Sequence, residues 1–485
     1  MGLDTTTRTG GKPVHIIPSA LAALLASFRE CFSGPSFDNF KTLVTGWILC
    51  AGRHTISRVL QAAGEAGLKK HHSTYYRFLS RGKWAADELG GVLFRLLVRW
   101  LPQEIEVQVD DTLCEKSGPH FFGAGMHHDS RRSTYGRGTR AGRRVCLAFG
   151  HNWVVLSVWL PRPWSPKRGW AVPVLFRLYR SKKRCPKTQY RKRTELAAEL
   201  VHRMASWLPA GCRLHLTGDR EYACKTLVRD LPEKTVFTGP MAMDAALYAP
   251  PEAYRGRGRR RVKGERLPSP QARAADPKAR WQPVVLTLYG KEVSLLVQTW
   301  TCLWYTVAGT RLVRVVLTRD PKGKARTQAF FCTGPRRSVV RILTSYAKRW
   351  SLEVAFFNAK QAMGLEDPQN GWWRRLAGSR SKKKRPGPQP KGRRGEQAVR
   401  HTVPLAFVAH GIVLVWYLRH GNPQQDVARV RRQAPWYRQK KDPSYWDMLA
   451  ALRRNILAER VSADPLTRRV RRKVLRLIPQ SLLAA

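Results

Sequence analysis

Acidic residues are scarce in this sequence of 485 residues, which contains 33 Asp and Glu against 88 Lys and Arg. The formal net charge of +55 is more than an ordinary soluble enzyme needs and indicates a polyanionic partner, most simply nucleic acid. The same scarcity makes an aspartate at the end of an apolar strand more informative than it is in an average protein.

Long apolar runs and paired cysteines are also absent. An anionic membrane is the competing partner for the positive charge. However, no apolar run of about 18 residues occurs without interruption by His, Arg or Pro, so a membrane-spanning helix is not expected. The most apolar stretch, 403–418, contains Pro404 and His410 and is interpreted as a buried helix. The nine cysteines occur singly, without a Cys-x-x-Cys pair, which argues against a disulfide framework and a zinc site. No cleavable signal is visible, so we expect a cytoplasmic protein.

Residues 1–101 are predicted to form a helical, DNA-binding domain. Apolar residues recur there three and four positions apart, and no alternating strand pattern occurs. Lys69 and Lys70 precede a Ser/Thr cap at the start of a helix predicted over 73–84, and helix starts and lysines suit phosphate contact. Arg77 would lie along the same groove. The alternative is a plain helical domain with a basic surface.

The apolar period changes after residue 101 and predicts a mixed α/β sheet with flanking helices over 102–230. Apolar and polar residues alternate from Ile105 to Val109, in a half-buried strand that ends at Asp110 and Asp111. Asp219 follows another predicted strand. The remaining elements are expected at 145–149, 154–160 and 176–179 (strands, the first two joined by a turn at 150–152), 194–208 (helix) and 213–217 (strand).

Residues 231–334 are interpreted as a β-rich subdomain inserted into this α/β unit. Its β-rich runs lie at 284–288, 293–299, 313–318 and 329–332. The segment 255–266 carries too many like charges to pack, and is either a disordered loop or a clamp for a polyanion. The core is expected to resume over 335–420, with a basic, Pro/Gly-rich tract at 374–394, and a basic helical tail follows over 421–485.

One predicted helix displays four different functional groups along a single edge. Residues 338–363 contain no Gly or Pro, so the helix is expected to be continuous. At about 100° per residue, four side chains fall in one narrow stripe. They are Tyr346, Arg349, Glu353 and Lys360. A phenol, a guanidinium, a carboxylate and an ammonium suit the binding of a metal beside a phosphate, whereas the alternative is a solvated helix with Arg349 paired to Glu353.

Asp110, Asp219 and Glu353 are the three acidic residues that this scaffold singles out. They are far apart in the sequence, so only folding could bring them together. Converging carboxylates suit Mg²⁺, which prefers oxygen ligands and keeps positions open for phosphates. Two such ions activate a water or hydroxyl and stabilise the leaving oxygen in phosphodiester displacement. The alternative is that the two aspartates only cap turns.

These residues resemble a known family. The spaced set is Tyr346-x2-Arg349-x3-Glu353-x6-Lys360, which matches the Tyr-Arg-Glu-Lys signature of DDE transposases of bacterial insertion sequences, the insertion-sequence-four group. The residues at 110–112 resemble that family's Asp-x-Thr strand end, and those at 219–222 resemble its Asp-x-x-Tyr. The order of the segments is also similar, so the resemblance spans about 35–420.

The resemblance implies an RNase H-like core in which Asp110, Asp219 and Glu353 hold Mg²⁺ or Mn²⁺ as two ions. It implies cut-and-paste transposition: water cuts double-stranded DNA at the terminal inverted repeats, and the freed 3′-hydroxyl attacks target DNA. A homodimer on DNA is the expected assembly. Because the first motif contains two adjacent aspartates, Asp111 is an alternative ligand.

The resemblance also implies DNA contacts. Arg349 and Lys360 would hold phosphates near the cut, since a planar fork and a point charge suit such groups, and Tyr346 would orient the same strand. Some relatives form a DNA hairpin in which an aromatic residue of the insertion stacks on a flipped base. Trp300 and Trp304 are the candidates here, with core tryptophans as the alternative.

Two further functions are weighed against transposition. The first is a catalytically inactive DNA-binding derivative, which the presence of all three acids and all four signature residues disfavours. The second is an RNase H-like nuclease that cuts without strand transfer.

Overall fold

The computed structural model describes residues 17–117, 121–129, 132–133, 145–252, 260–368, 392–463, 470 and 472. Contacts divide the chain into two compact units, Leu93–Phe357 and a second unit that combines Met1–Val92 with Asn358–Ala485. The predicted domain at 335–420 is therefore divided between the two units near residue 358. The tract 374–391 and residues 255–259 lie outside the described residues.

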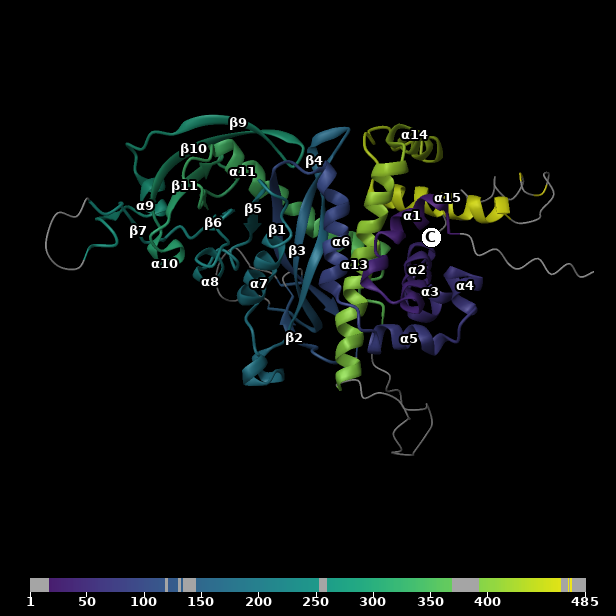
Figure 1. The fold of residues 1–485 in the computed structure, drawn as a ribbon. Helices are drawn as coiled ribbons and strands as arrows, with labels where there is room; N and C mark the ends of the chain where they lie inside the picture. Colours follow the sequence, from purple (N-terminus) through teal and green to yellow (C-terminus); the bar gives the residue numbers. More distant parts are fainter. Residues whose placement is uncertain are drawn as a thin grey trace, which may run out of the picture. The chain divides into compact units, whose positions relative to one another are not determined.

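The unit built from the two ends of the chain is helical where it is described. The N-terminal helices are α1 (Ser19–Ala26), α2 (Gly34–Leu49), α3 (Ile56–Ala63), α4 (Glu65–Leu68) and α5 (His72–Arg81). The C-terminal helices are α13 (Arg393–His420), α14 (Pro423–Gln433) and α15 (Tyr445–Ala463). Helix α13 packs against α1, α2, α5 and α15, so it is the central element of this unit (Figure 1).

Helix α13 confirms the buried helix that was predicted at 403–418. Nearly every side chain from Ala398 to Tyr417 is buried, and Pro404 lies inside the helix without ending it. Among the described helices, α13 alone is long and apolar enough to cross a membrane, and 94% of its apolar window is buried inside the protein. Its apolar character is therefore explained by packing against the other helices.

The Leu93–Phe357 unit contains a mixed sheet of 12 strands. Its central strands are β4 (Ser165–Tyr179), β3 (Leu147–Arg162), β1 (Glu104–Glu115), β5 (Arg213–Gly218) and β6 (Thr235–Met241), in that spatial order. The pairs β4–β3 and β3–β1 are antiparallel, whereas β1–β5 and β5–β6 are parallel. This α/β arrangement is consistent with the RNase H-like core expected from the resemblance. The short strand β2 (Gly125–His128) pairs with the first residues of β3, on the edge of β3 that faces away from β1.

One strand prediction was wrong. The strands expected at 145–149 and 154–160 form the single strand β3, without a turn at Gly150. The reason is that β1 continues past Asp110 to Glu115 and pairs with this segment, so that Glu115 lies opposite Gly150. A Cβ atom at Gly150 would lie 2.2 Å from the Cys114 carbonyl oxygen, so this glycine permits the close approach of two strands.

The predicted β-rich insertion continues the central sheet. From β6 outward the order is β12 (Gln328–Cys332), β11 (Leu312–Arg319), β10 (Lys291–Leu303), β7 (Leu247–Tyr248) and β8 (Arg266–Leu267), and β9 (Gln282–Leu288) also pairs with β10 (Figure 1). Strand β6 lies inside the predicted insertion but pairs in parallel with the core strand β5. The insertion therefore extends the sheet, and its strands share hydrogen bonds with the core.

Helices on the sheet carry the candidate site residues. Helix α7 (Arg193–Ala205) packs on β3 and β4, and α11 (Val339–Lys348) packs on β5, β6, β9 and β12. The helix predicted over 338–363 is divided into α11 and α12 (Trp350–Ala362). At the junction, the Arg349 N–H donates to the Tyr346 carbonyl and the Leu352 N–H donates to the Arg349 carbonyl, at 3.0 and 2.9 Å. This three-residue spacing tightens the turn that carries Arg349.

Candidate active site

Strand β1 presents acidic and polar side chains to α11. Because side chains alternate along a strand, those of residues 104, 106, 108 and 110 share one face. Glu106 and Gln108 are 4% and 1% exposed, so this face is covered. The interpretation of β1 as a half-buried strand was therefore wrong, because basic residues of α11 and its flanks compensate the buried carboxylates.

Ion pairs connect β1 to α11 in chain order. Glu104 accepts hydrogen bonds from Arg337 and Arg341. Glu106 pairs with Arg341 at 2.8 Å and with Lys348 at 2.7 Å. Buried carboxylates without partners are strongly unfavourable, so these pairs set the position of the helix along the strand. They place the following residue, Arg349, beside the end of this acidic face.

Arg349 joins two of the three predicted acids. Its Nη1 donates to Asp110 Oδ2 at 2.6 Å, and its Nη2 donates to Glu353 Oε1 at 2.8 Å. Its guanidinium also lies over the Tyr346 ring, 5.8 Å from the ring centre. Burial alone would lower the pKa of Arg349, but Asp110, Tyr346 and Glu353 together raise it, so this guanidinium stays charged. The helix-surface pair of Arg349 with Glu353 is thus present, as part of a larger cluster.

Asp219 lies beside Asp110 because their strands are parallel neighbours. Gly218 is paired with Val109 at the end of the β5–β1 ladder, so the next residue of each strand emerges at the same edge. Asp219 Oδ1 accepts the N–H groups of Glu221 and Tyr222, at 2.9 and 3.3 Å, which is the turn-capping role considered above. Among the residues that the structure describes, no hydrogen bond is made to its other oxygen, which could therefore take a further ligand.

The pKa of Asp110 reflects this crowding. It is raised to about 8 in all: burial is the largest cause, Arg349 acts in the opposite direction, and the charges on Asp219 and Asp111 act with burial. One guanidinium therefore does not compensate the carboxylates at this edge of the sheet. An additional cation would stabilise the ionised form of Asp110.

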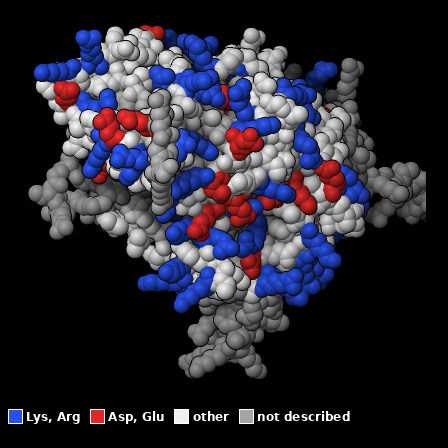
Figure 2. Space-filling view, turned by 60° about the vertical axis from the view of Figure 1, so that its left-hand side comes forward, with Lys and Arg blue, Asp and Glu red and all other residues white. Residues whose placement is uncertain are grey.

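The donor set fits a hard divalent cation. Carboxylate oxygens are the ligands that Mg²⁺ prefers, and Asp110, Asp219 and Glu353 supply them. Within the described ranges, no three Asp, Glu, His or Cys side chains are already arranged around one metal position. Asp110 and Glu353 do not face a common metal position because each accepts a hydrogen bond from a different nitrogen of Arg349. Figure 2 shows acidic side chains gathered near the middle of one face, with Lys and Arg around them.

Asp111 belongs to a separate network on the other face of β1. Its Oδ2 accepts from Asn152 Nδ2 at 2.7 Å and from Arg193 Nη1 at 3.2 Å, and its Oδ1 accepts from the Tyr222 hydroxyl at 3.3 Å. Arg193 also pairs with Glu221 at 2.7 Å. These contacts join the loop after Asp219 to β3 and α7. Of the two adjacent aspartates, Asp110 is therefore the one that faces Arg349.

Tyr289 is a residue that the sequence interpretation missed. It forms the two-residue turn between β9 and β10 with Gly290, and both have positive φ, 52° and 79°. Tyr289 is 67% exposed, and its pKa is raised by desolvation and by the charge of Glu353 and lowered by the charge of Arg349. The signal available in the sequence was the Tyr-Gly pair between two β-rich runs.

An exposed apolar edge of α12 was also missed. Trp350, Val354 and Phe357 are 53%, 44% and 59% exposed, and their spacing of four and three residues places them on one side of the helix. This edge adjoins the stripe that contains Glu353. Exposed aromatic rings beside a carboxylate cluster are suited to stacking on unpaired bases.

The other predicted residues of the insertion and of α12 have contacts of their own. Lys360 pairs with Glu366 at 3.0 Å, and both residues belong to the unit formed by the chain ends. Trp304 is buried and packs edge-on against Phe331, at 4.9 Å, as the core interpretation expected. Trp300 is half-buried, with the Arg273 guanidinium 4.3 Å from its ring centre.

The predicted basic residues of the N-terminal helices are at the surface. Lys69 and Arg77 are exposed, and Lys70 is half-buried and donates to Asn39 Oδ1 at 3.1 Å. The expected Ser/Thr cap of α5 was wrong, because the cap is His71, whose Nδ1 accepts from the Ser73 N–H at 3.4 Å.

Comparison with known proteins gives one family. Residues 27–307 match the family model described as DDE superfamily endonuclease. The matched range contains Asp110 and Asp219 and ends before Glu353. No curated protein matches the chain.

Proposed function

Because the chain belongs to the DDE superfamily endonucleases, we propose that it is a DNA transposase of the Tyr-Arg-Glu-Lys group that acts by cut and paste. It cleaves phosphodiester bonds at transposon ends and transfers the 3′-hydroxyl end to target DNA. The observation that carries the proposal is the convergence of Asp110 and Glu353 on Arg349, with Asp219 on the adjacent strand. DDE nucleases typically use divalent metals, and their substrate is DNA.

In this proposal Asp110, Asp219 and Glu353 hold Mg²⁺ or Mn²⁺ as two ions. Such ions, when bound, lower the pKa of a water and stabilise the leaving oxygen of a phosphodiester. Arg349 exchanges its contacts with Asp110 and Glu353 for a phosphate oxygen, because its planar fork suits both partners. Tyr346 orients the same strand with its hydroxyl.

Tyr289 is a better placed base-contacting residue than Trp300 or Trp304. Its phenol is influenced by the charges of Arg349 and Glu353, whereas Trp304 is buried and Trp300 is covered by Arg273. We assign to Tyr289, together with the exposed edge of α12, contact with unpaired bases beside the cut. Base stacking on an aromatic ring contributes about 1–3 kcal/mol per base.

The remaining basic surface serves the DNA duplex. Lys69, Lys70 and Arg77 contact phosphates of the terminal inverted repeats, Lys360 contacts a phosphate near the cut, and a homodimer in the bacterial cytoplasm is the acting form. Binding is then expected to weaken with salt, with a slope of log K against log[salt] of about −0.9 per phosphate neutralised. A slope near zero would contradict a role of the positive charge in DNA binding.

The decisive experiment uses the full chain, Mg²⁺ and a labelled duplex from either end of the DNA element that encodes it. Wild type is expected to nick the duplex, while Asp219→Asn and Glu353→Gln lose nicking and keep DNA affinity within a few-fold. Glu199→Gln, an exposed ion-pair residue of α7, is the matched control and should cut normally. Nicking by Glu353→Gln would remove this residue from the site.

A target plasmid separates the remaining alternatives. Joining of the labelled 3′-hydroxyl end to the plasmid supports a transposase. Cutting without joining favours a nuclease without strand transfer, and an inactive wild type that still binds the duplex favours the DNA-binding derivative.

A further inference from the structure

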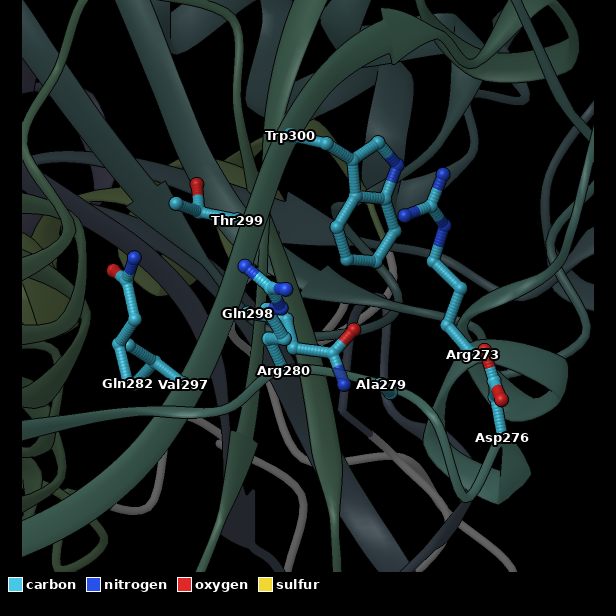
Figure 3. A pocket seen from close by; sticks show the side chains of 9 residues that line it. All are labelled: Arg273, Asp276, Ala279, Arg280, Gln282, Val297, Gln298, Thr299 and Trp300. Carbon is cyan, nitrogen blue, oxygen red and sulfur yellow. The ribbon is translucent and has the colours of Figure 1, made fainter.

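A polar pocket lies in the extended part of the sheet, apart from the carboxylate cluster. It is formed by β10, by α9 (Pro270–Ala275) and by the segment that leads from α9 to β9, and it has a volume of about 260 Å³. Pockets for drug-sized ligands have volumes of about 300–1,000 Å³, so this pocket suits a small group. Figure 3 shows Trp300 and Gln298 on the strand and Arg273 on the helix that faces them.

Three buried donors on residues that line this pocket have no hydrogen-bond partner within the described part of the chain. They are Arg273 Nε, Gln298 Nε2 and Trp300 Nε1. A buried donor without an acceptor is unfavourable, and more so when it is charged. A neighbouring polar group, the Thr299 hydroxyl, is already used, because it donates to the Val315 carbonyl and accepts from Arg314. The three donors are therefore suited to a ligand that brings acceptor oxygens.

The charge of the pocket favours an anion. Two arginines, Arg273 and Arg280, line it against a single carboxylate, Asp276, whose Oδ1 accepts the Lys278 N–H at 2.9 Å. Neither arginine forms an ion pair among the residues that the structure describes. Trp300 holds the Arg273 guanidinium over its ring, a contact that leaves the N–H groups of the guanidinium free to donate.

We propose that this pocket binds the phosphate group of a nucleotide unit. A phosphate offers several acceptor oxygens to the planar fork of Arg273, and Arg280 adds a second positive charge. The Gln298 amide donates to the same group, as amide side chains do to nucleic-acid phosphates. The unit is either part of a DNA strand or a free nucleotide, and the site does not depend on the cleavage chemistry proposed above.

The test is calorimetric titration of the full chain with thymidine 5′-monophosphate, inorganic phosphate and thymidine, in the absence of divalent metal. Wild type is expected to bind thymidine 5′-monophosphate and inorganic phosphate saturably, and not to bind thymidine. Arg273→Gln and Arg280→Gln should each weaken binding by about tenfold or more, since a hydrogen bond to a charged group contributes about 1.5–3 kcal/mol. Arg326→Gln, an exposed arginine of the β11–β12 connection, is the matched control and should leave the affinity unchanged.

Affinities that are equal in wild type, Arg280→Gln and Arg326→Gln would overturn the proposal. If Arg273→Gln lowers the melting temperature, Arg280→Gln still tests the proposal, because Arg280 is exposed and its substitution does not threaten the fold. Glu353→Gln should bind the monophosphate like wild type, so that a failure of this site and a failure of the proposed cleavage are distinguished. Competition by oligothymidylate that is lost in Arg273→Gln identifies a DNA strand as the source of the phosphate, and its absence identifies a free nucleotide.

Discussion

At the scale of single residues, adjacent aspartates on β1 have different surroundings. Asp110 faces Arg349, whereas Asp111 accepts hydrogen bonds from Asn152, Arg193 and Tyr222. The cause is the alternation of side chains along a strand, which sends neighbours to opposite faces. The two carboxylates are chemically identical, so their roles are decided only by the side chains that lie against each face of the strand.

Replacing each aspartate with asparagine should separate these roles. Asp110→Asn removes a carboxylate of the cluster and is expected to reduce DNA nicking by about a thousandfold or more, with the fold unchanged. Asp111→Asn leaves Arg193 with one carboxylate partner and should lower the free energy of unfolding by about 1–3 kcal/mol. Nicking assays and urea unfolding measure the two effects. If Asp111→Asn alone abolished nicking at full stability, the assignment of the two residues would be reversed.

Tyr289 is held in a backbone conformation that its side chain disfavours. A non-glycine residue at φ 52° costs about 1 kcal/mol or more, and such residues concentrate at functional sites. Tight turns of this kind between two strands favour Asn followed by Gly. The tyrosine at this position is therefore explained better by its place within range of the charges of Arg349 and Glu353 than by the stability of the turn.

Tyr289→Asn is expected to stabilise the protein and weaken its function. The free energy of unfolding should rise by up to about 1 kcal/mol, because asparagine tolerates positive φ. The same variant should lose affinity for DNA with unpaired bases at the cut, while affinity for a fully paired duplex changes little. Tyr437→Asn, an exposed tyrosine of the other unit, is the control. Unchanged binding by Tyr289→Asn would remove Tyr289 from the DNA-contacting set.

At the scale of elements, β1 and α11 are joined by charge. Glu104 and Glu106 meet Arg337, Arg341 and Lys348 in the order of the chain. Apolar contacts alone would allow the helix to slide along the sheet, whereas buried ion pairs are satisfied in only one register. This register sets where Arg349 and Glu353 stand relative to Asp110.

Glu106→Gln tests the contribution of this contact. The variant keeps the shape of the side chain but leaves Lys348 without its buried partner, so the free energy of unfolding should fall by about 3 kcal/mol. Glu199→Gln removes an ion pair whose carboxylate side chain is 53% exposed, and should cost less than about 1 kcal/mol. Both values come from urea unfolding. Similar losses of unfolding free energy in the two variants would show that the β1–α11 ion pairs stabilise the protein no more than an exposed ion pair does.

At the scale of the whole molecule, several histidines are buried, and burial favours their uncharged form. Burial lowers the pKa of His410 to about 3, and burial is also the main cause that lowers the pKa of His401 to about 4. Neither ring nitrogen of His410 has a hydrogen-bond partner within the described residues, and the ring stacks on Tyr445 at 4.3 Å. At these two histidines, the folded protein therefore binds fewer protons than the unfolded chain at mildly acidic pH.

Stability should consequently fall with pH below the ordinary histidine pKa of 6.5. The folded pKa of His410 is lower than the unfolded one, so its contribution is complete above pH 6.5 and is lost as the pH falls towards 3. The loss is about 1 kcal/mol per pH unit for each such histidine. His410→Phe should reduce the difference in unfolding free energy between pH 7 and pH 5, and the exposed His128→Gln should not. Equal pH dependence in both variants would contradict a buried neutral His410.

Local patterns in the sequence determined many of the elements. The strand before Asp110, the strand before Asp219 and the buried helix within 403–418 follow from the spacing of apolar residues, which reflects local backbone geometry. The spaced Tyr, Arg, Glu and Lys residues also identified the helix region that contains Arg349 and Glu353. A regular period is visible in the sequence because each element repeats its own geometry.

Only the tertiary structure decided how these elements meet. The continuous strand β3, the extension of the core sheet by the insertion, and the grouping of the two chain ends in one unit depend on contacts between distant segments. The same holds for Tyr289, whose turn is brought near Arg349 by strand pairing far from either residue. Hydrogen bonds and ion pairs between such segments leave no periodic trace in the sequence, so the composition of the site follows from the fold and not from any single stretch of the chain.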